Sequence, residues 1–341
     1  MRPTVHDIAA TAGVSLATVD RVLNNRPGVK RATRERVENA IGVLGYVRDV
    51  AAANLAKSRI YSLAFILPDG DNSFMGALEA AIAEAQSRGP HERTQVRLVK
   101  VPAFDAKALA EALDKIGAEG VDGLAAVAVD APEVAVAVER LSEKGIPFVT
   151  LVSDLTASAR AHYCGIDNSA AGRCAARLIG RFVSTPGAPV AVIAGSMLVK
   201  DHRERVEGFR DAVMRDHPEL RVLAPIEGRD DGAIVYRQIG MLLDERPDVA
   251  AIYSLGAGNR GLVRALKERG LAGKVKVVAH ELTPASRAAL EDGTIDVIIA
   301  QDPGHEVRSA VRILKAKADG QPVIDAQEKI GIDIFLKDNL P

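Results

Sequence analysis

The chain has 341 residues, of which 48% are apolar, so it is long enough for two or three compact domains with sizeable buried cores. No apolar run approaches the roughly 18 residues that a membrane span needs, and the N-terminus lacks the apolar segment of a secretory signal. The two cysteines, Cys164 and Cys174, form neither a disulfide framework nor a cluster of metal ligands. We therefore expect a cytoplasmic protein with two reduced thiols and no membrane partner.

The formal net charge of -1 is unevenly distributed along the chain. Residues 1–60 hold ten Lys and Arg against five Asp and Glu, whereas the remaining residues hold 34 basic and 40 acidic side chains. A basic segment before an acidic body indicates that the first 60 residues meet a polyanion. A solvated basic face would produce the same modest excess.

Three short helical patterns fill this basic segment. Thr4 precedes the first pattern and Asp7 stands three residues later, as in a capping box. Gly13 and Ser15 separate this pattern from a second, and a third covers about residues 33–44. Two short helices joined by a tight turn that contains Gly are typical of a helix-turn-helix, which inserts one helix into the DNA major groove.

Four motifs, DIAATAGVS, ATV.RVLN, T.ERV and LGY, occur in this order between Thr4 and Asp49. In these motifs the segment resembles the DNA-binding head of the lactose-repressor (LacI-type) family of bacterial transcription regulators. The resemblance implies an operator made of double-stranded DNA. It also implies DNA contacts from Thr4, Ser15, Leu16, Ala17, Thr18, Arg21, Asn24, Arg31, Ala52 and Leu55.

The resemblance places three of these side chains on the base-reading face of the second helix. Arg21 can donate two hydrogen bonds to a guanine, and Leu16 and Ala17 offer apolar contacts to a thymine methyl group. Backbone phosphates, which position the head without reading sequence, are the partners implied for Thr18, Asn24 and Arg31.

Asp20 departs from the family pattern, in which many members carry Ser. A phosphate would repel this carboxylate, so we expect Asp20 to pair with a nearby Arg or to accept a hydrogen bond from a cytosine amine. A solvent-facing helix charge without a role in recognition is the alternative.

Residues 48–60 form a linker whose Ala-rich interior favours a helix that would be marginal alone. In the resembled family this segment is a hinge helix that orders on the operator and inserts a leucine into the minor groove. Leu55 holds that position and Ala52 lies one turn earlier. Such an insertion kinks DNA, although a leucine that packs on the body is the alternative.

From Tyr61 onward, near-continuous apolar strands alternate with helical patterns. This alternation predicts parallel sheets covered on both faces. It occurs in two similar halves, at about residues 61–163 and 164–301, which predict two lobes.

The family's effector domain resembles the type I periplasmic sugar-binding proteins, which implies that the chain crosses back between the lobes. Residues 302–327 would then complete the first lobe and residues 328–341 the second. We predict a helix-turn-helix head over residues 1–47, the linker over residues 48–60 and a two-lobed α/β body over residues 61–341.

Polar side chains follow several predicted strands, at the sheet edge where open α/β folds bind ligands. Asn72 offers an amide, Phe74 offers a flat face for a pyranose ring, and Arg205 stands where the family places an Arg that bridges two hydroxyls. Each one alone would more often be an ordinary loop residue. Together they predict a site for a small sugar or polyol effector, formed by Asn72, Phe74, Ser153, Asp154, Arg205, Ser254, Asn259, Glu281 and Gln301.

Residues 256–261, GAGNRG, fit the G-x-G-x-x-G turn of dinucleotide-binding enzymes, and Glu281 ends the next strand, near the usual ribose-binding acid. A nicotinamide-dependent oxidoreductase is therefore one alternative. Against it, the turn lies in the fourth strand–helix unit of the half that begins near Pro189, whereas dinucleotide folds use their first unit.

The family often carries Asn-Asp at the positions of Leu255 and Gly256. We therefore expect Ser254, Asn259 or exposed backbone amides to supply polar contacts there.

A sugar-binding protein without a regulatory role is the second alternative function.

The chain has neither an H-E-x-x-H nor a G-x-S-x-G motif, and we predict no catalytic residue, cofactor or metal. The sequence as a whole predicts a homodimeric repressor of a pseudo-palindromic operator, controlled by a sugar or polyol.

Overall fold

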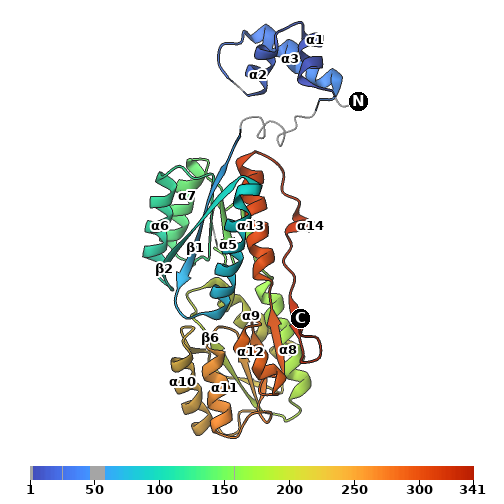
Figure 1. Cartoon of the computed structure of the whole chain (residues 1–341). Helices are drawn as coiled ribbons and strands as arrows, with labels where there is room; N and C mark the ends of the chain where they lie inside the picture. Colours follow the sequence, from blue (N-terminus) through green and yellow to red (C-terminus); the bar gives the residue numbers. More distant parts are fainter. Residues whose placement is uncertain (1–2, 25, 47–57, 157) are drawn as a thin grey trace. The chain divides into compact units, whose positions relative to one another are not determined.

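The computed structural model describes residues 3–24, 26–46, 58–156 and 158–341 (Figure 1). The chain divides into two compact units, with the boundary between Arg59 and Ile60.

Three helices form the first unit: α1 (Val5–Ala12), α2 (Leu16–Leu23) and α3 (Arg31–Leu44). Ile8, Val19 and Val37 are fully buried between them. The predicted capping box is confirmed, because the Thr4 hydroxyl accepts from the Asp7 N–H while the Asp7 carboxylate accepts from the Thr4 N–H.

The second unit contains two sheets, each buried on both faces. The first sheet is parallel, in the order β2-β1-β3-β4-β5, and its strands are β1 (Tyr61–Asp69), β2 (Thr94–Pro102), β3 (Gly123–Ala126), β4 (Phe148–Leu151) and β5 (His162–Cys164). Its apolar residues form one core with α5 (Ser73–Glu92) and α13 (Pro303–Ala318), and another with α6 (Ala106–Ala118) and α7 (Pro132–Glu143). We call this part lobe 1.

The second sheet has the order β12-β11-β10-β9-β6-β7, with β8 also paired to β6. Its strands are β6 (Pro189–Ala194), β7 (Arg221–Val222), β8 (Ile226–Glu227), β9 (Ala251–Ser254), β10 (Lys276–His280), β11 (Val297–Ala300) and β12 (Asp333–Phe335). Its helices are α8 (Asn168–Phe182), α9 (Lys200–Asp216), α10 (Gly232–Glu245), α11 (Asn259–Glu268) and α12 (Pro284–Glu291). We call this part lobe 2.

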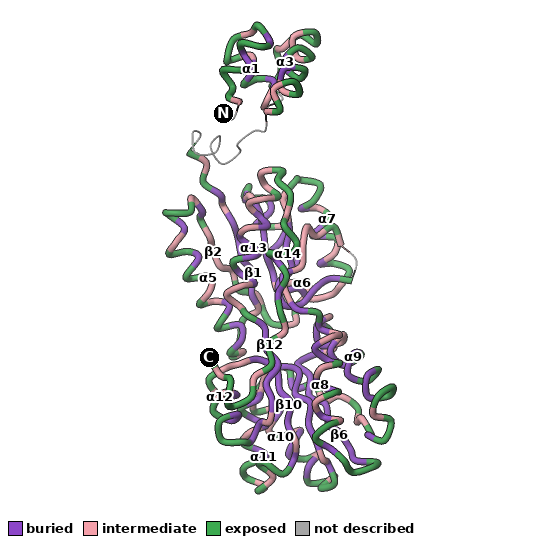
Figure 2. The backbone as a smooth tube through the Cα atoms, turned by 90° about the vertical axis from the view of Figure 1, so that its right-hand side faces the viewer, coloured by how far each residue is buried: buried purple, intermediate pink, exposed green. Residues whose placement is uncertain are grey.

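The chain passes between the lobes after β5, after β11 and after the short α14 (Asp325–Glu328). In Figure 1, α13 therefore lies beside α5 in lobe 1, whereas β12 pairs antiparallel with β11 in lobe 2. The central strands of both sheets are buried, whereas the edge strands β2 and β12 and the outer helix faces are partly exposed (Figure 2). The predicted fold class, a helical head with a parallel-sheet α/β body, is confirmed.

Helices α8 and α9 pack backbone to backbone because glycine lies at their contact. A Cβ on Gly172 would lie 2.2 Å from the Arg205 carbonyl oxygen, and a Cβ on Gly208 would lie 2.2 Å from the Ser169 carbonyl oxygen. This close approach sets the position of α9, which carries Arg205.

We expect Gly172→Ala to destabilise the body by about 1–3 kcal/mol, because the added methyl group forces two backbones apart. Thermal unfolding of the full chain measures this loss. Gly76→Ala in α5 is the matched control, because nothing lies within 4 Å of its Cβ, and it should stabilise by about 0.5–1 kcal/mol. Equal effects of the two substitutions would contradict the account of the α8–α9 contact.

Candidate functional site

A cavity of about 690 Å³ lies between the two lobes. Lobe 1 lines it with the loops that follow β1 to β4, and lobe 2 with the loops that follow β6, β8, β9 and β10 and with the start of α9. These strands run parallel within each sheet, so the cavity lies at their carboxyl ends, where open α/β sheets bind ligands. Its volume is in the range of small-molecule sites.

Backbone strain is concentrated at this cavity. Five non-glycine residues of its wall have left-handed φ angles: Phe104 (59°), Val152 (60°), Arg229 (51°), Asp230 (58°) and Glu281 (68°). Such conformations cost of order 1–3 kcal/mol each and cluster at ligand sites.

Several buried polar atoms of the cavity wall make no hydrogen bond to the described part of the protein. Within the described residues, no hydrogen bond reaches Ser153 Oγ, Asp201 Oδ1, Arg205 Nη2 or His280 Nδ1. Buried polar groups are nearly always paired, so this set requires a ligand or water. It combines a hydroxyl, a carboxylate acceptor, a guanidinium donor and an imidazole nitrogen.

Arg205 is held in one orientation by lobe 2. Its Nε donates to Asn168 Oδ1 and its Nη1 donates to the Leu255 carbonyl, both at 2.8 Å. Burial lowers the pKa of Arg205, but Asp201 and Glu281 outweigh burial, so the net shift is upward and the group stays charged. The remaining Nη2 can therefore act as a fixed donor into the cavity.

Glu281 lies 3.7 Å from Arg205 Nη2 and accepts from Gln301 Nε2 at 2.9 Å. Burial raises the pKa of Glu281 to about 7, although Arg205 and Gln301 favour the ionised form. The carboxyl group is thus divided between its two protonation states near neutral pH. Gln301 itself does not line the cavity.

The predicted effector residues divide into two groups. The cavity is lined by Asn72, Phe74, Ser153, Arg205, Asn259 and Glu281. It is not lined by Asp154, Ser254 and Gln301.

Three of the predicted polar side chains are occupied by other bonds. Asn72 caps α5 through its Oδ1, while its Nδ2 donates across the cavity to Asp230 Oδ2 at 3.0 Å. Ser254 Oγ donates to Asn259 Oδ1 at 2.7 Å, and Asn259 Nδ2 donates to the His280 carbonyl at 3.0 Å. Ser254 and Asn259 therefore hold β9, α11 and β10 together.

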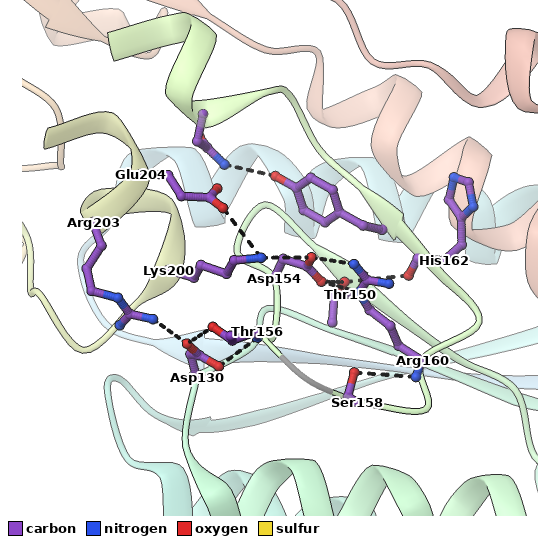
Figure 3. A network of polar contacts seen from close by, with 12 residues as sticks. Asp130, Thr150, Asp154, Thr156, Ser158, Arg160, His162, Lys200, Arg203 and Glu204 are labelled. Carbon is purple, nitrogen blue, oxygen red and sulfur yellow. Dashed lines mark hydrogen bonds and ion pairs between the residues drawn. The ribbon is translucent and has the colours of Figure 1, made fainter. Parts of the chain in front are cut away.

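Asp154 belongs to a separate polar network (Figure 3). Its Oδ1 accepts from Thr150 Oγ1 at 2.7 Å, and both oxygens accept from the Arg160 guanidinium. Lys200 of lobe 2 completes its surroundings, with Nζ 3.4 Å from Oδ2.

Asp201 was not predicted as an effector residue, although its free oxygen points to a ligand. The signal for it was the spacing of four residues to Arg205, which places both side chains on one face of α9.

The glycines of the GAGNRG turn are explained by close packing. A Cβ on Gly256 would lie 2.5 Å from the Gly195 nitrogen, and one on Gly261 would lie 1.9 Å from the Gly232 carbonyl oxygen. The Ala257 N–H donates to Asp230 Oδ1 at 2.9 Å. A carboxylate therefore occupies the turn in which a dinucleotide fold holds a pyrophosphate, which argues against the oxidoreductase.

In the first unit, α2 buries only Val19 and Val22. Leu16, Ala17 and Arg21 are exposed together on its other side, as base reading requires.

The predicted phosphate-contacting residues have local partners. Ser15 caps α2, and its Oγ lies 3.0 Å from Thr18 Oγ1. Arg31 pairs with Glu35 one turn later at 2.9 Å. Ala52 and Leu55 lie outside the described residues.

Asp20 lies on the exposed side of α2. It pairs with a nearby Arg, which is one of the two partners expected for it from the sequence. Its Oδ1 accepts from Asn24 Nδ2 at 2.6 Å, and its Oδ2 lies 3.2 Å from Arg26 Nη1. Asp20 thus engages a cation and an amide that could otherwise reach phosphates.

Two families match the chain. Residues 4–49 match the family described as bacterial regulatory proteins, lacI family, and residues 63–322 match the periplasmic binding protein domain. Across the described ranges, we find no helix that is long and apolar enough to span a bilayer.

Similar proteins include named transcriptional regulators. An uncharacterized HTH-type transcriptional regulator in the aml 5' region of Streptomyces limosus is 29% identical, covering 79% of this chain and 75% of the relative. The HTH-type transcriptional regulator CelR of Thermobifida fusca is also 29% identical, covering 74% and 73%.

Similar solved structures share the fold of the body. GanP, a glucose-galactose binding protein from Geobacillus stearothermophilus, is 24% identical with a TM-score of 0.74, covering 83% of this chain and 99% of that one. A solute binding protein of an ABC transporter from Burkholderia graminis, in complex with D-arabinose, is 24% identical with a TM-score of 0.75, covering 83% and 97%.

The raised pKa of Glu281 predicts a pH-dependent stability. The folded chain keeps this proton up to about pH 7, whereas an unfolded carboxyl releases it near pH 4.5. The contribution of Glu281 to the free energy of unfolding should therefore be greatest below pH 4.5 and be lost as the pH rises through 7. Glu281→Gln should remove up to about 3 kcal/mol of this loss, measured by unfolding at pH 5 and pH 8. Identical pH profiles for variant and wild type would refute the shift.

For DNA binding, we expect Asp20→Asn to release Arg26 for a phosphate. Non-specific affinity should rise, and the slope of log K against log salt should steepen by about one. Anisotropy titrations of a random duplex at several salt concentrations measure both.

Arg26→Ala provides the control, made with and without Asp20→Asn. The gain should vanish without Arg26 if Asp20 acts by holding that cation. A gain of the same size in the Arg26→Ala background would instead show direct repulsion between Asp20 and DNA.

Proposed function

Because this chain belongs to the lacI family of bacterial regulatory proteins and carries a periplasmic binding protein domain as its body, we propose that it is a cytoplasmic repressor controlled by a sugar or polyol. Its head binds operator DNA, and its effector binds in the cavity between the lobes. The observation that carries the effector proposal is the set of unpartnered polar atoms buried in the cavity wall.

These atoms suit a neutral polyhydroxy compound. One hydroxyl group can donate to Asp201 Oδ1 and accept from Arg205 Nη2, because a hydroxyl is both donor and acceptor. An anionic ligand is disfavoured, since Asp201 and the ionised form of Glu281 already offset the charge of Arg205. Phe74 offers an aromatic ring for the apolar face of a sugar.

The relatives support this assignment from both ends of the chain. The curated relatives are named transcriptional regulators, and the solved structures of similar fold include a glucose-galactose binding protein and a complex with D-arabinose. The two alternative functions lack such support. A sugar-binding protein without a regulatory role would not need the lacI-type head. In an oxidoreductase, the Asp230 carboxylate would occupy the glycine turn that has to bind the pyrophosphate of the cofactor.

Two heads of a homodimer would read the two halves of a pseudo-palindromic operator. The effector acts only through its different affinities for the two lobe arrangements. Its binding would change whether the linkers order on DNA with Leu55 in the minor groove.

The experiment pairs a thermal-shift panel with a salt-sensitive gel shift on the chain's own upstream DNA. The panel holds D-glucose, D-galactose, D-arabinose, D-xylose, myo-inositol and D-mannitol. We expect one of these compounds to stabilise the protein and to change operator binding.

Asp201→Asn should weaken that stabilisation at least tenfold in ligand concentration, since it removes the charge from a buried acceptor, while operator binding persists. Arg21→Ala is the converse control, with operator selectivity lost and ligand stabilisation kept. A full ligand response from Asp201→Asn, or no shift with any upstream fragment, would overturn the proposal.

A further inference from the structure

The first turns of α9 divide their side chains between the cavity and lobe 1. Asp201 and Arg205 line the cavity. Lys200, which directly precedes Asp201, and Arg203, which lies between Asp201 and Arg205, instead reach carboxylates of lobe 1 (Figure 3). Residues 200–205 of α9 therefore include side chains that line the cavity and side chains that contact lobe 1.

The first of these contacts joins Lys200 to Asp154. The two groups lie 3.4 Å apart, and their side chains are only 22% and 7% exposed. Burial raises the pKa of Asp154, but the hydrogen bonds from Arg160 and Thr150 lower it below its ordinary value, so the carboxylate is ionised. Lys200 thus meets a full negative charge that lobe 1 holds rigidly.

The second contact joins Arg203 to Asp130, which lies in the loop between β3 and α7. Arg203 Nη2 donates to Asp130 Oδ2, and the same carboxylate accepts from the Thr156 N–H at 2.9 Å and its hydroxyl at 2.6 Å. Arg203 also donates to the Met197 carbonyl at 3.0 Å. Both partners are thus fixed by their own lobes before they meet.

We call these two pairs the α9 clasp: Asp130 with Arg203, and Asp154 with Lys200. None of its four residues lines the cavity. Because its side chains are mostly shielded from water, its ion pairs are screened less than surface pairs.

The lobes are bridged differently at the cavity itself. There Asn72 donates to Asp230 at 3.0 Å, and Arg260 pairs with Asp71 in an exposed position. All four of these residues line the cavity, so a ligand can replace their contacts. The clasp lies outside the cavity lining, so a ligand in the cavity does not compete for its contacts.

We propose that the four residues of the α9 clasp are positioning residues that fix the start of α9 against lobe 1, so that the lobes pivot about this contact. A ligand bound by Asp201 and Arg205 then changes the relative orientation of the two lobes, because the same turns of α9 contact lobe 1 through Lys200 and Arg203. This use of the clasp rests on the proposed effector site, whereas the contact between the lobes does not.

The test measures the distance between the lobes in the full chain without ligand. Spin labels are placed at Val136→Cys on α7 and Met241→Cys on α10, which are exposed positions in lobe 1 and lobe 2. Cys174→Ser removes one native thiol, and Cys164 is buried with a raised pKa and so is unreactive. Labelled chains are diluted with unlabelled ones, so that each distance lies within one chain.

Asp130→Asn should shift the distance distribution and broaden it, and Arg203→Gln should do the same. The double variant should add little to either single one, because both remove the same pair. Asp114→Asn is the matched control, since Asp114 pairs with Arg140 at 2.6 Å entirely within lobe 1, and it should leave the distribution unchanged.

Distributions equal to wild type in Asp130→Asn and in the double variant would overturn the clasp. The thermal-shift panel with the same variants separates the two proposals. A changed distance with no sugar response would remove the effector assignment and leave the clasp, and an unchanged distance with a sugar response would do the reverse.

Discussion

The buried guanidinium of Arg205 is the group on which the cavity depends. It ties α9 to α8 through Asn168 and to the end of β9 through the Leu255 carbonyl, and it faces Glu281 after β10. A buried cation needs such partners, because an unpaired one is very costly. Four segments of lobe 2 are therefore arranged around one charge, and a single donor remains for the cavity.

This arrangement also limits what the cavity can bind. Asp201 and Glu281 supply the negative charge that burial of Arg205 demands, so little positive potential remains for an anion. The free atoms are instead matched to groups that donate and accept at the same time. The preference for a polyol thus follows from the way in which the protein stabilises its own buried charge.

Periodicity and strand ends predicted the head, the parallel sheets and the side of the sheets that carries the cavity, because these depend on local patterns. Asn72 and Glu281, which follow strands, line the cavity for the same reason, whereas Arg205, which lies within α9, was predicted from the family resemblance. The pairing of Asp154 with Lys200 could not be predicted, because it joins residues of different lobes. The hydrogen bond between Ser254 and Asn259 could not be predicted either, because it depends on how β9 packs against α11. Strand position predicts a location, and tertiary contacts decide whether a polar group stays free.

The GAGNRG turn shows the same limit for a motif. Its glycines meet a steric demand, the approach of the turn to β6 and α10, which a dinucleotide fold shares. Ligand chemistry is set by what faces the turn, and here Asp230 takes the Ala257 amide while reaching Asn72 across the cavity. A backbone that could bind phosphate is thereby used to hold two lobes together. The motif describes the packing of the turn, and a carboxylate from another loop determines its function.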